Sequence, residues 1–189
     1  MAKEKIQKPK VEGKKQEPKA PKIKGENPMR KMMLEKVVLN CGGTDDKFDR
    51  GLKLLQILTG KKIKEITSTK RIPSFGVRPG LKTGSMVTLR GEEAAKLLKR
   101  LLGAVENKLS KKQIADNHFS FGIEEYLEIP DMEYQRDIGV LGMDVTAVFK
   151  RAGKRVGQKK IKSGKVPKKQ SVTREEIIDY LTKLGITIE

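Results

Sequence analysis

Alternating apolar and polar positions predict several short β-strands along this chain. The pattern is clearest at residues 119–123, where Phe119, Phe121 and Ile123 share one side and small or polar residues separate them. A strand with this alternation places one face in a core and the other in solvent. Further strands are predicted at residues 32–40, 61–72, 85–90 and 144–150.

Apolar residues spaced three to four apart predict three helices. The first covers residues 45–59, with Thr44 as its expected N-cap, and the second covers residues 92–107. The third begins after Thr173, which together with Glu176 has the spacing of a capping box. In chain order the elements read β–α–β–β–α–β–β–α.

This order of elements predicts an α+β fold, with a single, mostly antiparallel sheet and helices packed on one face. The other face of the sheet is then open, and it is polar around Thr67, Thr69 and Thr88. Such a face suits a surface that meets RNA. Residues 29–189 are expected to form this one domain.

Residues 1–28 are expected to form a flexible basic tail outside the domain. They hold nine lysines, four glutamates and four prolines, and few apolar side chains. So little apolar surface cannot offset the entropy lost on ordering. The same composition is compatible with a tail that orders when it meets RNA.

The formal net charge of +18 on 189 residues requires an anionic partner. Nucleic acid is the commonest polyanion in a cell, and an anionic membrane surface is the second candidate. Glycine and proline break the basic runs, and no stretch has the apolar length of a membrane span, so membrane binding is disfavoured. A single cysteine excludes an internal disulfide and fits a reducing compartment, so we expect a cytoplasmic protein.

Two internal segments are basic without any compensating acid. Residues 67–90 carry five Lys or Arg and no Asp or Glu, and Phe75 among them offers a ring on which a base can stack. Residues 150–169 carry ten Lys or Arg and no acid, with the glycines and proline of a loop or arm. A single run of this kind is usually a solvated surface. Two such runs and a basic tail on one short chain favour RNA binding.

The charge inverts between the two basic segments. Residues 113–144 hold eight acidic residues against one basic residue, Arg136. This stretch is either a solvated surface or a patch that meets a basic protein.

No catalytic or metal-binding signature is found, so the sequence predicts neither an enzyme nor a cofactor. His118 and Cys41 each lack a second His or Cys at metal-ligand spacing. No Gly–Lys pair is followed by Ser or Thr, which excludes a P-loop. The acids at 45–46 suit a helix N-terminus, and those at 124–125 would point to opposite sides of a strand.

Five ordered segments resemble the universal large-subunit ribosomal protein L-five family, which binds 5S rRNA in the central protuberance. The basic insertion at 150–169 resembles the archaeal and eukaryotic branch of that family. The five segments are EKVVLNCGG at 35–43, ITSTKRIPSFGVRPG at 66–80, MVTLRG at 86–91, FSFGIEEY at 119–126 and GMDVTAVF at 142–149.

The resemblance implies a sheet that binds 5S rRNA and a loop, residues 74–85, that contacts P-site tRNA. It also implies neighbouring ribosomal proteins as partners, including a small-subunit protein across a bridge, and contacts of the arm with large-subunit rRNA. Lys61 stands where the family often has Gln, so its expected contact is with a phosphate. The expected rRNA contacts are Asn40, Lys61, Thr67, Thr69, Thr88, Arg90, Lys150, Arg151, Lys154, Arg155, Lys159 and Lys160; the expected tRNA contacts are Ser74, Phe75, Arg78 and Lys82.

The main alternative is a non-specific basic RNA-binding protein or RNA chaperone. Such a protein would bind many RNAs alike, and its affinity would fall steeply with salt. A protein of the L-five type would still discriminate 5S rRNA when salt screens the phosphate contacts.

Overall fold

A computed structural model describes residues 27–188 of the chain and confirms the predicted α+β architecture. The expected tail lies outside the described residues apart from its last two positions. The main sheet has six strands in the order β2-β3-β1-β7-β6-β5, and every neighbouring pair is antiparallel. Its strands are β1 (Met32–Gly42), β2 (Lys64–Thr67), β3 (Lys82–Leu89), β5 (Ile114–Ala115), β6 (His118–Ile123) and β7 (Met143–Arg151).

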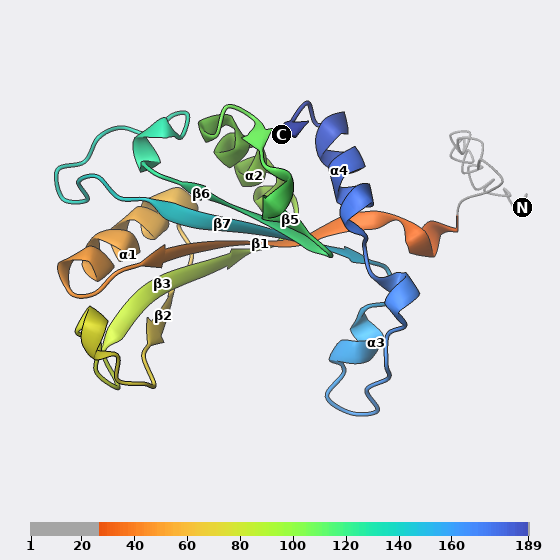
Figure 1. Cartoon of the computed structure of the whole chain (residues 1–189), viewed down its shortest axis with the longest axis horizontal. Helices are drawn as coiled ribbons and strands as arrows, with labels where there is room; N and C mark the ends of the chain where they lie inside the picture. Colours follow the sequence, from red (N-terminus) through yellow and green to blue (C-terminus); the bar gives the residue numbers. More distant parts are fainter. Residues whose placement is uncertain (1–26, 189) are drawn as a thin grey trace, which may run out of the picture.

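Three helices cover one face of this sheet, as Figure 1 shows: α1 (Asp46–Thr59), α2 (Glu92–Ala104) and α4 (Arg174–Lys183). A small parallel pair, β4 (Lys108–Leu109) and β8 (Thr187–Ile188), joins the segment after α2 to the C-terminal end. The short helix α3 (Arg155–Gln158) belongs to the basic arm. Single 3₁₀ turns lie at Pro28–Arg30, Pro73–Phe75, Lys111–Gln113, Tyr126–Glu128 and Lys168–Gln170.

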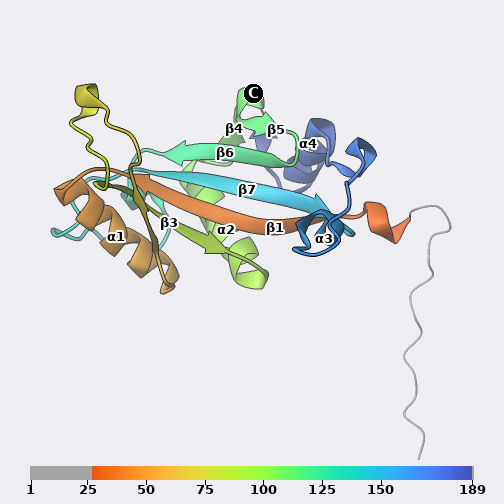
Figure 2. The same cartoon turned by 90° about the horizontal axis from the view of Figure 1, so that it is seen from below.

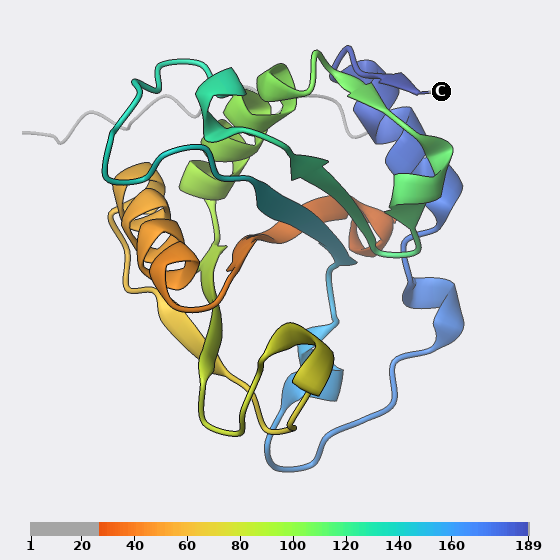
Figure 3. The same cartoon turned by 60° about the vertical axis from the view of Figure 1, so that its left-hand side comes forward.

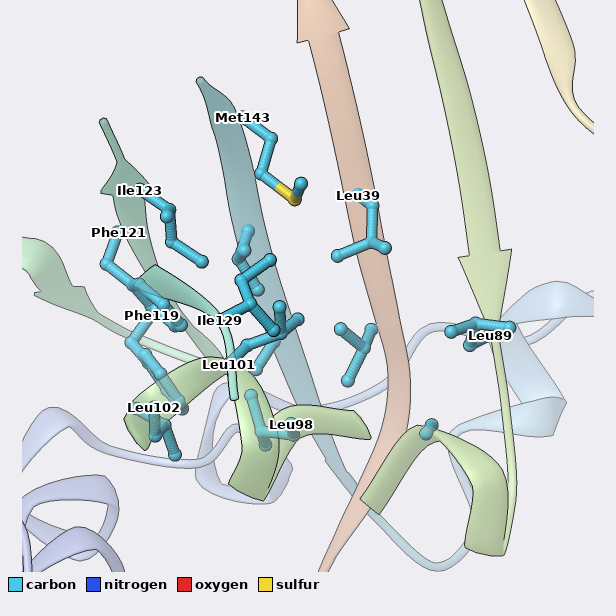
Figure 4. Close-up of a cluster of buried hydrophobic side chains, with 14 of the residues drawn as sticks. Leu39, Leu89, Leu98, Leu101, Leu102, Phe119, Phe121, Ile123, Ile129 and Met143 are labelled. Atoms are coloured by element: carbon cyan, nitrogen blue, oxygen red, sulfur yellow. The ribbon is translucent and has the colours of Figure 1, made fainter. Parts of the chain in front are cut away.

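The core lies between the helices and the sheet (Figure 4). The alternation predicted for residues 119–123 is confirmed, because Phe119, Phe121 and Ile123 are at most 3% exposed while the residues between them are exposed. Phe119 stacks on Phe149 of β7 with ring centroids 5.9 Å apart. Each fully buried side chain of this size contributes roughly 1.5–3 kcal/mol, so the apolar stripe fixes which sheet face meets the helices.

The ends of α1 and α2 differ from the prediction. Asp45, with a positive φ of 50°, is the residue before α1, so Thr44 lies outside the cap position and only its carbonyl accepts a hydrogen bond, from Lys47. Helix α2 ends at Ala104 rather than at residue 107, because Glu106 and Asn107 adopt positive φ and turn the chain. The periodicity of the sequence predicted both helices, but local turns determine where each helix begins or ends.

The capping box predicted at the start of α4 is wrong. The Thr173 side chain makes no capping hydrogen bond. Both carboxylate oxygens of Glu176 instead accept hydrogen bonds from Arg151 at the end of β7. A tertiary ion pair with two hydrogen bonds is stronger than a neutral local cap, so it takes the carboxylate.

The strand predicted at residues 61–72 is shorter than expected, and its partner is longer. Strand β2 ends at Thr67, after which the Ser68 N–H donates to the Leu81 carbonyl and the Gly80 N–H donates to the Ser68 carbonyl. These bonds close the base of a loop at residues 68–81. Strand β3 begins at Lys82 rather than at residue 85, so the predicted loop at 74–85 is displaced by several residues toward β2.

Candidate RNA interface

The sheet face opposite α1, α2 and α4 carries no helix, and we call it the open face (Figures 1 and 2). Its side chains alternate with the buried ones and lie in register across the strands. For example, Val38 pairs with Thr88 on one side and with Thr146 on the other, and Thr146 pairs with Ser120. Its members are Lys64, Thr88, Met86, Lys36, Val38, Asn40, Asp144, Thr146, Val148, Lys150, His118, Ser120 and Gly122.

Three of the expected rRNA contacts, Asn40, Thr88 and Lys150, lie on this face. Asn40 is half-buried on the central strand β1, and its cross-strand neighbours are Met86 and Asp144. Thr88 on β3 is exposed. Small hydroxyl and amide side chains on an uncovered sheet face leave room for RNA and offer both donors and acceptors.

The loop at residues 68–81, called the hairpin loop, is organised by its own backbone. Ile72 and Val77 exchange two backbone hydrogen bonds of 2.9 and 3.1 Å around the turn at Pro73–Phe75, and Gly76 adopts a left-handed φ of 66°. Phe75 is 76% exposed, an unusual position for a phenyl ring unless something covers it. Ser74, Arg78 and Thr69 are also exposed, and Thr67 is exposed where β2 enters the loop.

Lys82, the fourth expected tRNA contact, lies on β3 at the base of the hairpin loop. Its ammonium group lies 2.8 Å from the Glu65 carboxylate and 5.5 Å from the centre of the Phe48 ring. These contacts hold the lysine against the body, so its predicted tRNA contact stays a prediction. Lys70, Arg71 and Arg78, in contrast, make no ion pair with any of the described residues.

The arm predicted at residues 150–169 begins at the end of β7 and curls around an open hollow of about 730 Å³. All six expected arm contacts line this hollow although they span eleven positions of the sequence. Lining side chains include Lys150, Arg151, Lys154, Arg155, Lys159 and Lys160. The structure therefore brings these six cations together, as a site for a phosphate backbone requires.

Glu35 ties the base of the arm to the sheet. Its carboxylate, whose side chain is 9% exposed, lies 3.0 Å from Lys154 and 3.9 Å from Lys150, and Gln158 also donates to it. Burial raises the pKa of the Glu35 carboxyl, but the hydrogen bond and charge of Lys154, with Gln158 and Lys150, outweigh this and leave the pKa below its usual value. Glu35 lies in β1 where the register with β7 shifts, which turns its side chain toward the arm.

Arg151 lies differently from the other arm cations. It is 8% exposed, its Nη2 group donates to both carboxylate oxygens of Glu176 of α4 at 2.5 Å, and its Nη1 group donates to the Lys169 carbonyl. The guanidinium thereby joins β7, the end of the arm and α4. Its predicted contact with rRNA stays a prediction, and the structural contacts suffice to explain why an arginine stands there.

The hairpin loop and the arm project to the same side of the sheet, away from α2 and α4 (Figures 1 and 3). They extend from opposite ends because β3 begins where the hairpin loop ends and β7, which runs in the same direction, ends where the arm begins. The open face is thus bounded at both ends by basic segments.

Lys61 and Arg90 lie outside this arrangement of face, loop and arm. Lys61 follows α1 and forms an ion pair with Glu93 in the first turn of α2, which lowers the pKa of that carboxyl through the hydrogen bond and charge of the lysine. Arg90 is exposed between β3 and α2. Their expected rRNA contacts stay predictions.

The acidic stretch forms mainly the long loop between β6 and β7, at the end of the molecule away from the arm (Figure 1). Its acidic side chains are exposed, and so are Leu127, Tyr134 and Val140. Tyr126 and Ile129 anchor the loop in the core, and the Tyr126 hydroxyl accepts a hydrogen bond from the Gln135 N–H. This loop presents a mixed acidic and apolar surface, which we call the acidic loop.

Sequence reasoning missed much of the open face, although alternation contains the signal. Once Val37 and Leu39 or Phe119 and Phe121 are recognised as core residues, Lys36 and Ser120 must face the other way.

Cys41 is a buried packing residue, and burial together with the charge of Asp144 raises the pKa of its thiol to about 12. Among residues 27–188 no group of three or more His, Cys, Asp or Glu is placed to hold a metal ion. In the same range no helix has the length and apolar character needed to cross a membrane.

Residues 82–180, the part of the chain from β3 to α4, match the model of the C-terminus of the ribosomal L5 family. Three archaeal relatives share the name large ribosomal subunit protein uL5. The relative from Archaeoglobus fulgidus is 39% identical over 89% of this chain and 96% of its own length. That from Nanoarchaeum equitans is 41% identical over 86% of this chain and 99% of its own, and that from Aeropyrum pernix is 39% identical over 85% and 86%.

A helix-backed sheet whose open face is bounded by basic loops is the kind of surface that structural RNA-binding proteins use. The matches are long and cover nearly the whole of the relatives. The chain belongs to the ribosomal L5 family, as its sequence motifs predicted. Its relatives show that it is of the archaeal type, which lies within the archaeal and eukaryotic branch that the basic insertion indicated. It is therefore a structural, non-enzymatic ribosomal protein.

Proposed function

We propose that this protein of the large ribosomal subunit binds 5S rRNA with its open face, in the central protuberance. The observation that carries the proposal is a polar sheet face free of helices and bounded at both ends by basic segments. Asn40, Thr88 and the neighbouring hydroxyl groups supply hydrogen bonds to bases and riboses, which salt screens weakly. The cations at the two ends supply affinity for phosphates.

The hairpin loop is proposed to contact tRNA in the P site. Its support is the exposed Phe75 ring at the tip together with Arg71 and Arg78, which are exposed and unpaired among the described residues. An arginine can stack on a base or bind a phosphate, and a phenyl ring can stack on a base. A loop that is organised by its own backbone can reach away from the sheet without unfolding it.

The arm and the acidic loop are proposed to make the remaining contacts within the ribosome. The arm would bind large-subunit rRNA through the cations around its hollow. The acidic loop would meet a basic ribosomal protein, and a small-subunit protein across a bridge is the partner we propose for it. With these partners the protein would act at the ribosome in the cytoplasm.

The alternative of a non-specific RNA-binding protein predicts different behaviour toward salt. Phosphate contacts release counterions, so binding that relies on them loses affinity equally for all RNAs as salt rises. Hydrogen bonds from the open face depend on RNA structure instead. Selectivity at high salt therefore separates the two functions.

The test is binding to 5S rRNA and to an unrelated structured RNA of equal length at several salt concentrations. We expect a preference for 5S rRNA that persists at high salt and is destroyed by Asn40→Ala with Thr88→Ala. A matched variant, Arg71→Ala with Arg78→Ala in the hairpin loop, should keep the preference. Equal binding of both RNAs at every salt concentration would reject the proposal in favour of the non-specific alternative.

A further inference from the structure

Asp144 places a negative charge on the open face near the start of β7, where phosphate binding alone would favour a cation. It is exposed on β7, directly across from Asn40 on β1 and Gly122 on β6. Glu35, a carboxylate near the end of the face that the arm bounds, is paired with Lys154 and Lys150. Within the described part of the chain Asp144 forms no ion pair, so its charge is available to a ligand.

Gly122 leaves open space beside this carboxylate. A Cβ atom added to Gly122 would have an Asp144 oxygen at 3.8 Å as its only neighbour within 4 Å outside the adjoining residues, so packing does not require glycine there. Its backbone does not have the positive φ that favours glycine either. Glycine inside a strand costs stability and often marks a place where a ligand approaches the backbone closely. Asn40, Asp144 and Gly122 therefore lie in a row across β1, β7 and β6. They present an amide, a carboxylate and a stretch of backbone that no side chain covers.

The chemistry of this row excludes a phosphate and fits a base with two adjacent N–H donors. A carboxylate repels a phosphate, and it accepts hydrogen bonds only. Guanine presents N1–H and N2–H side by side, which match two carboxylate oxygens, and its O6 can accept from the Asn40 amide about 5 Å away across the strands. Adenine, cytosine and uracil each place a ring nitrogen lone pair or a carbonyl next to their donor, which would face the second oxygen.

We propose that Asp144 is a specificity-determining residue that binds the Watson–Crick edge of an unpaired guanine in 5S rRNA, with Asn40 beside it. This inference rests on the proposed function of the open face and adds the base that the face reads. The guanine must be unpaired because its N1–H and N2–H are otherwise engaged with cytosine. The base lies over Gly122, where a larger side chain would collide with it.

The first part of the test compares the wild type with Asp144→Asn, which keeps the shape and removes the charge. We expect about tenfold to hundredfold weaker binding of 5S rRNA and unchanged or slightly tighter binding of an unrelated RNA, because repulsion of phosphates is reduced. Glu128→Gln, which removes an exposed charge from the acidic loop, is the matched control and should change neither affinity more than twofold. Thermal unfolding of Asp144→Asn should be close to that of the wild type, and circular dichroism checks its fold.

The second part replaces each unpaired guanine of 5S rRNA in turn by inosine, which lacks the N2 amino group. One replacement should weaken RNA binding by the wild type about tenfold and RNA binding by Asp144→Asn less than twofold. The variant has already lost the contact between the carboxylate and the N2 amino group, so removing that amino group costs it little more. If no inosine position shows this coupling, the proposal is overturned, including the case in which Asp144 instead holds a hydrated Mg²⁺. If the wild type binds the unrelated RNA as tightly as 5S rRNA, the proposed function itself is wrong. This comparison separates that outcome from a failure of the Asp144 proposal alone.

Discussion

The hairpin loop and the arm look alike in sequence and differ in how the structure uses their charges. Both are basic, rich in glycine and proline, and free of acids. The hairpin loop is held by backbone hydrogen bonds, such as those between Ile72 and Val77, and presents its arginines to solvent. The arm is held to the body by its cations, through Lys154 with Glu35 and Arg151 with Glu176.

A basic run therefore contains two kinds of cation. Some stabilise the segment itself and are already neutralised, and others remain free to bind phosphate. The exposed Arg155, Lys159 and Lys160 of the arm belong to the second kind, and Arg151 belongs to the first. The sequence gives only the total charge of a basic run. Which of its cations are neutralised depends on partners from distant elements of the fold.

The largest effect on stability is expected for Arg151→Met. Removing one partner of a buried ion pair leaves the other without compensation, and since Glu176 is partly exposed we expect a loss of about 2 kcal/mol in the free energy of unfolding. Urea unfolding measures this. Arg155→Met, four residues along the arm and exposed, should lose less than about 0.5 kcal/mol. Equal losses would contradict the division between structural and free cations.

Phe75→Ala should weaken tRNA binding without affecting stability. Loss of a base-stacking ring costs about 1.5 kcal/mol, or roughly tenfold in Kd. Ile161→Ala in the arm is a close match, since Ile161 is 78% exposed and Phe75 is 76% exposed, but an isoleucine offers no ring. Titration of labelled tRNA with both variants should show the tenfold loss for Phe75→Ala alone, and a similar loss for both would remove the proposed role of the hairpin tip.

Glu35→Gln is expected to weaken the attachment of the arm and to lower the free energy of unfolding by about 1 kcal/mol at neutral pH. Because contacts with lysines lower the pKa of Glu35 in the folded protein, its contribution is complete above the ordinary carboxyl pKa and is lost as pH falls through the folded value. The difference in unfolding free energy between wild type and variant should therefore shrink below about pH 4. A difference that stays constant down to about pH 2 would show that the charge of Glu35 has no role.

The smallest effect is expected in the salt dependence of RNA binding. Arg78→Ala removes a free cation and should reduce the slope of log K against log salt by about 0.7–0.9 for one phosphate contact. Lys154→Ala removes a cation that Glu35 already neutralises, so its slope should change by less than half as much. The reverse order would show that RNA displaces Glu35 and that the arm reorganises on binding.

Much of the fold was predictable because apolar stripes are local and strong. The alternation of Phe119 and Phe121 predicted β6, and the helical spacing of the leucines predicted α2. The parallel pair β4 and β8 was not predictable, since two-residue strands have no period to detect. The capping box failed for a different reason, because the partner of Glu176 lies 25 residues away in sequence.

The site was predictable in its polarity and its motifs but not in its geometry. Asn40 and Thr88 came from motifs, and both lie on the open face. That Arg151 is buried, or that Asp144 faces the same side as Asn40, depends on the register of β7 against β1 and on contacts with α4. Register is a property of the assembled sheet, so no stretch of the sequence shows it alone.

The most direct measurement is hydroxyl-radical footprinting of the protein with and without 5S rRNA, read out by mass spectrometry. Met86 and His118 lie on the open face and react readily, while Ile57 and Leu184 are exposed on α1 and after α4. We expect 5S rRNA to protect Met86 and His118 and to leave Ile57 and Leu184 as reactive as before. Protection of Ile57 and Leu184 with Met86 and His118 unchanged would place the RNA on the helices and contradict binding by the open face.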